Sequence, residues 1–155
     1  MIAPGNGYIA VLDTCVLAPM PLCDTLRRMG YSAEQASRRI DAMEAAFEDA
    51  GVTGYEELIG TMTNDVKDRH VLAAAVRCGA HAVVTQNVRH FPAESARMYD
   101  LEVLTPDAFL VHQFHVNHQL LRQRLEAQAE ALGGTMDALL NKLARFAPAC
   151  VQLLL

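Results

Sequence analysis

The chain has 155 residues, of which 52% are hydrophobic and 20% charged, and this balance excludes an intrinsically disordered protein. The length suits one domain with one core. No stretch approaches the roughly 18 consecutive apolar residues of a membrane span, so no membrane partner is expected. The formal net charge is −5, whereas proteins that bind nucleic acid through their own charge are usually basic. Either the chain does not bind nucleic acid, or metal ions and a local basic patch supply the positive charge.

Two features predict a cytoplasmic protein. No basic residue precedes the apolar run Ile9–Leu12, and that run is too short for the core of a secretory signal. The four cysteines form no CxxC pair, so neither a zinc knuckle nor a thioredoxin-like motif is indicated. In the cytoplasm these thiols would be reduced.

The first predicted elements are a strand and two helices. Tyr8–Leu12 (YIAVL) is a short apolar run that predicts a buried parallel strand. A helix is expected over Leu17–Met29. The next helix begins at Ser32, which forms a capping box with Gln35, and it ends at Gly51.

A central helix and a second strand follow. The helix is predicted from Asp65 to Cys78, ending before Gly79, and Val71–Val76 is apolar nearly all round. A helix with so little polar surface should be buried. Ala82–Thr85 (AVVT) then predicts another buried strand.

The C-terminal half is predicted to be mainly helical. Leu101–Leu104 predicts an edge-like strand, and Thr105–Leu110 begins with a cap followed by proline, which starts a helix. Helical patterns continue over Val111–Leu132 and Thr135–Arg145, and Pro148 is expected to limit the last helix. This order of strands and helices predicts an α/β fold, a parallel sheet with helices on its faces.

Polar side chains mark one edge of the expected sheet. Asp13 ends the first strand, and Asn87 lies two residues beyond the second. Asp65 and Asp68 occupy the first turn of the intervening helix, three residues apart, so both are expected to project from one face. Carboxylates this close repel one another unless a hard cation binds them. The pattern predicts a Mg²⁺ or Mn²⁺ site; the alternative is that each aspartate is only a cap or turn residue.

Basic and histidine side chains have weaker signals. The basic residues near the acidic cluster would contact the phosphates of a nucleic acid or form a solvated face; they are Lys67, Arg69, Arg77 and Arg89. His70 and His90 are candidates for proton transfer by proximity alone. Histidines also recur every third residue, but on a helix they drift apart, which favours a solvated or packing role over a metal site; they are His112, His115 and His118.

Three stretches together resemble a known family. Asp65–Pro92 reads DVKDRHVLAAAVRCGAHAVVTQNVRHFP, Val11–Leu17 reads VLDTCVL, and Leu104–Leu110 reads LTPDAFL. They resemble PIN-domain proteins, among them the VapC-type toxins of toxin–antitoxin pairs, in the branch with a DxxDRHVLAAA helix and a VTxN strand end. The likeness covers about residues 8 to 112.

The resemblance implies a PIN-like domain over residues 1–112 and a C-terminal helical extension over 113–155 packed on the same domain. It implies Mg²⁺- or Mn²⁺-dependent endoribonuclease chemistry. The metal ligands would be Asp13, Asp65 and Asp68, with Asn87 as a further catalytic residue. The implied partners are an RNA substrate and a cognate antitoxin protein. The apolar end Val151–Leu155 would pack on the core or form a homodimer.

The chain departs from the family pattern at three places. Cys15 stands where relatives often carry Asn, and His90 where this branch often has Asp. Relatives also carry a strand, a helix and a glutamate that residues 22–31 replace with a shorter connection. The alternative function is therefore a catalytically silent PIN-like binding module. A haloacid-dehalogenase-type phosphatase is a third possibility, but it needs a second aspartate where Cys15 stands.

Overall fold

The computed structural model describes residues 8–13, 32, 34, 38 and 51–155. Its contacts divide the chain into two compact units, Met1–Val103 and Leu104–Leu155. The expected helix over residues 17–29 and the shortened connection at 22–31 lie outside the described residues. In the helix expected after Ser32, Glu34 and Arg38 are helical, and their charged groups lie 3.8 Å apart across one turn.

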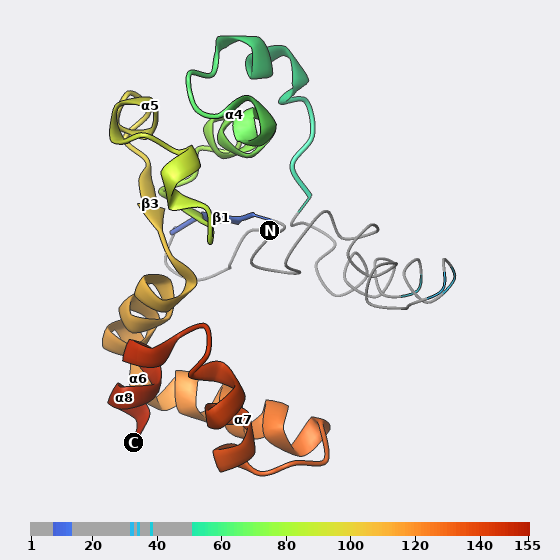
Figure 1. Cartoon of the computed structure of the whole chain (residues 1–155), viewed down its shortest axis with the longest axis vertical. Helices are drawn as coiled ribbons and strands as arrows, with labels where there is room; N and C mark the ends of the chain where they lie inside the picture. The colour runs from blue at the N-terminus through green and yellow to red at the C-terminus, as the bar shows by residue number, and fades with distance from the viewer. Residues whose placement is uncertain (1–7, 14–31, 33, 35–37, 39–50) are drawn as a thin grey trace. The chain divides into compact units, whose positions relative to one another are not determined.

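The first unit contains a three-stranded parallel sheet, as expected for an α/β fold. Its strands are β1 (Ala10–Leu12), β2 (Ala82–Val84) and β3 (Glu102–Leu104), in the order β1-β2-β3 (Figure 1). β1 and β2 pair with Ala10 opposite Ala82 and Leu12 opposite Val84. All of β2 is buried, which agrees with its continuous apolar sequence.

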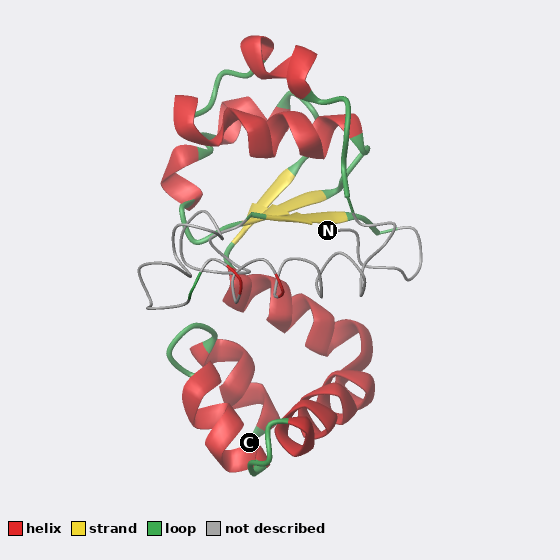
Figure 2. Ribbon diagram, turned by 90° about the vertical axis from the view of Figure 1, so that its right-hand side faces the viewer, coloured by secondary structure: helices red, strands yellow, loops and turns green. Residues whose placement is uncertain are grey.

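Helix α4 (Arg69–Arg77) packs on the sheet, contacting both β1 and β2, and Figure 2 shows it along one side. The prediction of a buried central helix is confirmed, because Val71, Leu72 and Ala75 are at most 5% exposed. The helix ends before Gly79, whose φ of 61° is a conformation that glycine adopts without steric cost.

Short helices precede α4 and connect β2 to β3. The 3₁₀ helices η1 (Glu56–Thr61) and η2 (Val66–Asp68) precede it. The 3₁₀ helix η3 (Val88–His90) and helix α5 (Ala93–Arg97) connect β2 to β3. Because α4 runs back along the sheet before β2 begins, its N-terminus lies at the edge where β1 and β2 end.

The second unit consists of helices α6 (Pro106–Ala131), α7 (Met136–Leu143) and α8 (Pro148–Leu154). The predicted caps are confirmed: Thr105 and Thr135 accept hydrogen bonds from backbone N–H groups three residues later, at 3.1 and 3.2 Å. The helical patterns predicted up to Leu110 and from Val111 onward form one helix, α6, whose one non-helical residue is Asn117.

One expectation for this unit is wrong: the helix that ends before Pro148 is not the last one. Helix α7 ends at Leu143, before Pro148 as expected, but Pro148 also starts α8, since proline suits the first helical position. The contacts divide the chain after Val103, and α6 packs against α8; the domain boundary expected at residue 112 stays a prediction. Val151 and Leu154 join this unit's core. The packing of the extension on the first unit stays a prediction. Among the described residues, no helix has both the length and the apolar character needed to cross a membrane.

Candidate functional site

Asp13 lies at the carboxyl end of β1 and is held there by β2. Its backbone N–H donates to the carbonyl of Val84 at 3.0 Å, and its Oδ2 accepts from Thr85 Oγ1 at 2.7 Å. Asp13 is 4% exposed and Thr85 is fully buried. Burying a carboxylate is costly unless it is hydrogen-bonded, so the Thr85 hydroxyl is part of what makes this position tolerable.

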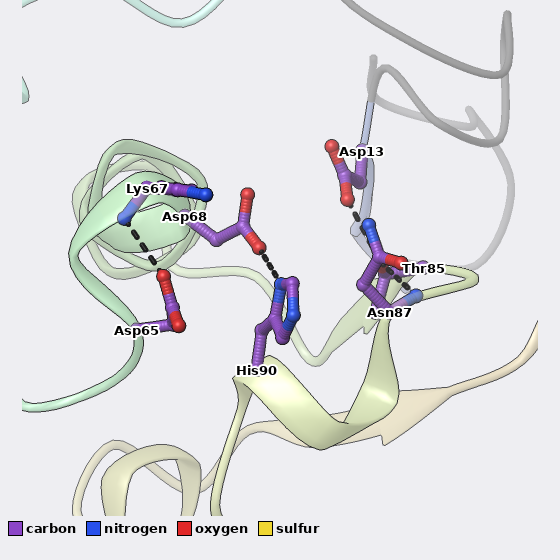
Figure 3. Close-up of polar contacts among 7 residues, drawn as sticks. All are labelled: Asp13, Asp65, Lys67, Asp68, Thr85, Asn87 and His90. Atoms are coloured by element: carbon purple, nitrogen blue, oxygen red, sulfur yellow. Dashed lines mark hydrogen bonds and ion pairs between the residues drawn. The ribbon is translucent and has the colours of Figure 1, made fainter.

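Asn87 joins the same hydrogen-bonded group. Its backbone N–H donates to Thr85 Oγ1 at 3.0 Å, so the Thr85 hydroxyl accepts from Asn87 and donates to Asp13. Asn87 is the N-cap of η3, but its side chain makes no capping bond. That side chain extends on the side of Asp13 (Figure 3), which leaves an amide oxygen and nitrogen beside a buried carboxylate.

Asp65 and Asp68 point in different directions, contrary to the expectation that they share one helix face (Figure 3). The residues between them form a 3₁₀ turn, and Asp68 itself has φ −113° and ψ 9°. Asp65 caps that turn, since its Oδ1 accepts from the backbone N–H of Lys67 at 3.0 Å. Asp68 stands at the N-cap of α4 without a capping bond.

The Asp68 carboxylate instead contacts His90, the last residue of η3. Asp68 Oδ2 and His90 Nδ1 are 2.6 Å apart, with side chains 15% and 24% exposed. A second bond ties the same segments together, because the backbone N–H of Asp65 donates to the carbonyl of His90 at 3.0 Å. The sequence suggested His90 only by its proximity to the acidic residues, and a contact across 22 residues has no local signal.

The donor atoms at this edge suit a hard cation. Figure 3 shows Asp68 extending from the start of α4 toward the space beside Asp13. In the described part of the chain, no group of three histidine, cysteine or acidic side chains is placed to hold a metal. Mg²⁺ in proteins is commonly held by one or two carboxylates and keeps several waters. Two carboxylates with the amide of Asn87 match that chemistry, while the Asp65 carboxylate faces the backbone of Lys67.

Asn64, directly before Asp65, was not identified from the sequence. It is 2% exposed, and within the described residues neither side-chain polar atom has a hydrogen-bond partner. The backbone carbonyl of Asn64 accepts a hydrogen bond from Arg69 Nε at 3.3 Å, so the Arg69 guanidinium makes a structural contact. An unpaired buried amide costs stability, but no sequence signal distinguishes it from an exposed asparagine.

The remaining candidates have different surroundings. Lys67 and Arg89 are exposed close to the site. The three regularly spaced histidines of α6 are also exposed, and Phe114 contacts the rings of His115 and His118 at centroid distances of 5.7 Å. Packing against Phe114 accounts for these two rings, as the sequence interpretation expected.

Comparisons with known proteins agree with this fold and these strand-end residues. The chain is 35% identical over 124 residues to "Putative ribonuclease VapC50" of Mycobacterium tuberculosis, a match that covers 80% of this chain and 69% of that protein. No protein-family model matches the chain, and no solved structure matches it. Identity of this level over most of both chains, together with the parallel sheet and its acidic edge, shows that the chain belongs to the VapC family of PIN-domain proteins.

Proposed function

We propose that this protein is a metal-dependent endoribonuclease and the toxin component of a toxin–antitoxin pair. The observation that carries the proposal is the placement of Asp13 and Asp68 at one edge of the sheet. The relative at 35% identity is named as a ribonuclease, which supports RNA as the substrate. The partners are then an RNA and an antitoxin protein that restrains the enzyme.

Asp13 and Asp68 would hold Mg²⁺ or Mn²⁺, with the Asn87 amide as a further oxygen donor. Such an ion supplies Lewis-acid chemistry, activating a water and neutralising charge that develops on a phosphate. Thr85 keeps the Asp13 carboxylate in place through its 2.7 Å hydrogen bond. Asp65 acts indirectly, because it caps the turn that carries Asp68.

The exposed cations near this edge provide a route for RNA binding in a chain of net charge −5. Lys67 and Arg89 are exposed and belong to the two segments, η2 and η3, that carry Asp68 and His90. Basic side chains bind phosphates irrespective of base sequence. Lys67 and Arg89 would therefore hold the RNA backbone, and the metal ion would offset the acidic residues.

The test compares metal-induced stabilisation in three forms of the chain. Mg²⁺ or Mn²⁺ should raise the Tm of the unchanged protein, because a ligand that binds only the folded state stabilises it. Asp68→Asn should abolish most of this shift and all metal-dependent RNA cleavage. Asp65→Asn is the matched control: asparagine is an equally good cap, so most of the shift should remain.

The second candidate function is a catalytically silent PIN-like binding module. It is favoured by the finding that no group of three potential ligands gathers within the described residues. In that case the metal ions would leave the Tm of the unchanged chain where it was, and RNA would be bound without being cut. A metal shift that is lost in Asp65→Asn but kept in Asp68→Asn would contradict the assignment of ligands made above.

A further inference from the structure

Asp65 and Asp68, which begin and end the sequence DVKD, make different contacts. The Asp65 carboxylate is occupied by the backbone N–H of Lys67. The Asp68 carboxylate makes no capping bond, although Asp68 occupies the N-cap position of α4. Its contact in the described structure is the 2.6 Å approach of His90 Nδ1 to Oδ2. Asp68 is therefore the aspartate available to a ligand, and a histidine from another element holds it.

We propose that His90 is a positioning residue for the metal site, donating from Nδ1–H to Asp68 Oδ2 and so directing the carboxylate toward the space it shares with Asp13. This inference rests on the proposed function and adds a residue to it. Figure 3 shows the other Asp68 oxygen directed away from the imidazole ring. One oxygen is thus held by His90, and the second stays available to a cation.

The surroundings make His90 suitable for holding a carboxylate in place. The Asp68 and His90 side chains are only 15% and 24% exposed, so water competes weakly for their hydrogen bond. The carbonyl of His90 also accepts from the backbone N–H of Asp65, and the next residue, Phe91, is 3% exposed in the core. The backbone that carries the ring is therefore fixed, and the hydrogen bond from the ring restricts the orientation of the Asp68 carboxylate.

A histidine here differs in chemistry from the aspartate that the resembling branch often carries. Aspartate would add a third negative group beside Asp13 and Asp68, and nearby carboxylates oppose each other's ionisation. An imidazole adds no negative charge and offers a donor that fixes one carboxylate. Groups that orient a metal ligand through a hydrogen bond typically change metal affinity or activity by about 10–100-fold when removed.

The first measurement needs neither metal nor RNA. Long-range ¹H–¹⁵N NMR of the imidazole nitrogens should show His90 with its proton on Nδ1, because only that tautomer, or the charged ring, donates to Asp68. In Asp68→Ala, which removes the acceptor, the pattern of His90 should change, while that of exposed His70 on α4 should not. A proton on Nε2 alone in the unchanged chain would overturn the proposed contact.

The second measurement is Mn²⁺ affinity by titration calorimetry on the full chain. His90→Leu should weaken binding at least about tenfold. His90→Asn should stay within about threefold of the unchanged chain, since its side-chain amide can donate from nearly the position of Nδ1. His70→Leu is the matched control for loss of an imidazole close to Asp68 and should leave affinity unchanged.

The outcomes separate the two proposals. If the unchanged chain binds Mn²⁺ but His90→Leu binds it equally well, the role of His90 is wrong and the metal site stands. Equal weakening in His90→Leu and His90→Asn would likewise contradict positioning through an Nδ1 donor. If the unchanged chain binds no Mn²⁺, the metal-dependent function falls, and the role of His90 in metal binding falls with it.

Discussion

At the scale of single residues, the site depends on how a buried carboxylate is kept hydrogen-bonded. Asp13 is 4% exposed and receives the Thr85 hydroxyl at 2.7 Å. That hydroxyl also accepts from the backbone of Asn87, so one side chain links the ends of β1 and β2 to the start of η3. Thr85 thus has a structural task beyond its place in an apolar strand.

Replacing Thr85 tests this task. Thr85→Val keeps the shape of the side chain but removes the donor to Asp13 and the acceptor for Asn87. A hydrogen bond to a charged group contributes about 1.5–3 kcal/mol, so the free energy of unfolding in urea should fall by an amount of this order. Thr85→Ser retains the hydroxyl and should lose much less. A larger loss in Thr85→Ser than in Thr85→Val would show that the methyl group, not the hydroxyl, matters.

At the scale of elements, α4 is the core element of the first unit. Leu72 is 0% exposed and belongs to the cluster that packs against the sheet. Leu72→Ala should reduce the free energy of unfolding by about 2–5 kcal/mol, through lost burial and the cavity left behind. Leu132→Ala, at a leucine that is 66% exposed, is the matched control and should stay within about 0.5 kcal/mol. A similar loss at both positions would contradict the assigned core.

In the second unit, Asp107 connects the starts of α6 and α8. Its Oδ2 and Oδ1 accept from the backbone N–H groups of Ala149 and Cys150 at 3.0 and 2.9 Å. These groups lie in the first turn of α8, where N–H groups lack helical partners and favour negative charge.

Removing that carboxylate should therefore loosen α8. Asp107→Ala should lower the stability of this unit by about 0.5–2 kcal/mol, the usual cost of a lost cap. Faster hydrogen exchange at the amides of Val151 and Leu154 is the direct readout. Asp137→Ala removes an exposed aspartate in the first turn of α7 that has no long-range hydrogen bond or ion pair within the described residues, so it should leave α8 unchanged. Unaltered hydrogen exchange in Asp107→Ala would show that the Asp107 carboxylate does not stabilise the start of α8.

At the scale of the whole molecule, alkaline pH should act on at least one group in each unit. Burial, with the Asp107 carboxylate as a smaller cause, raises the pKa of the Cys150 thiol. Burial, with Glu102 as a smaller cause, raises the pKa of Tyr8. Each group is neutral when protonated, so above its ordinary pKa the unfolded chain releases the proton before the folded chain does.

Stability should consequently fall as pH rises above the ordinary thiol value of about 8.5 and then the tyrosine value of about 10. Urea unfolding at pH 7.5 and pH 10.5 measures this loss. Cys150→Ala and Tyr8→Phe should each show a smaller decrease between the two pH values than the unchanged chain, whatever their stability at pH 7.5. A decrease as large as that of the unchanged chain in both variants would contradict the assignment.

The sequence predicted the features that depend on neighbouring residues. The run around Val83, the apolar helix around Leu72 and the caps at Thr105 and Thr135 are local patterns, and the structure confirms each of them. The family was inferred from short sequence motifs, and the inference agrees with the similarity to VapC50. Helix α8 was not predicted, because a proline that follows one helix can also begin the next; α7 ends before Pro148, and α8 starts there and packs against α6.

No local sequence signal predicted the different roles of the Asp65 and Asp68 carboxylates. Asp65 and Asp68 are equivalent in a helical pattern, yet a 3₁₀ turn directs one carboxylate to the backbone of Lys67 and the other to His90. The turn is held by the bond between Asp65 and the carbonyl of His90, which exists only once η3 has packed beside α4. Residue types and their order along the chain therefore sufficed for the three described strands, the central helix and the family. Which carboxylate is available to a ligand depends on backbone dihedral angles set by contacts between distant segments, and those contacts form only in the folded chain.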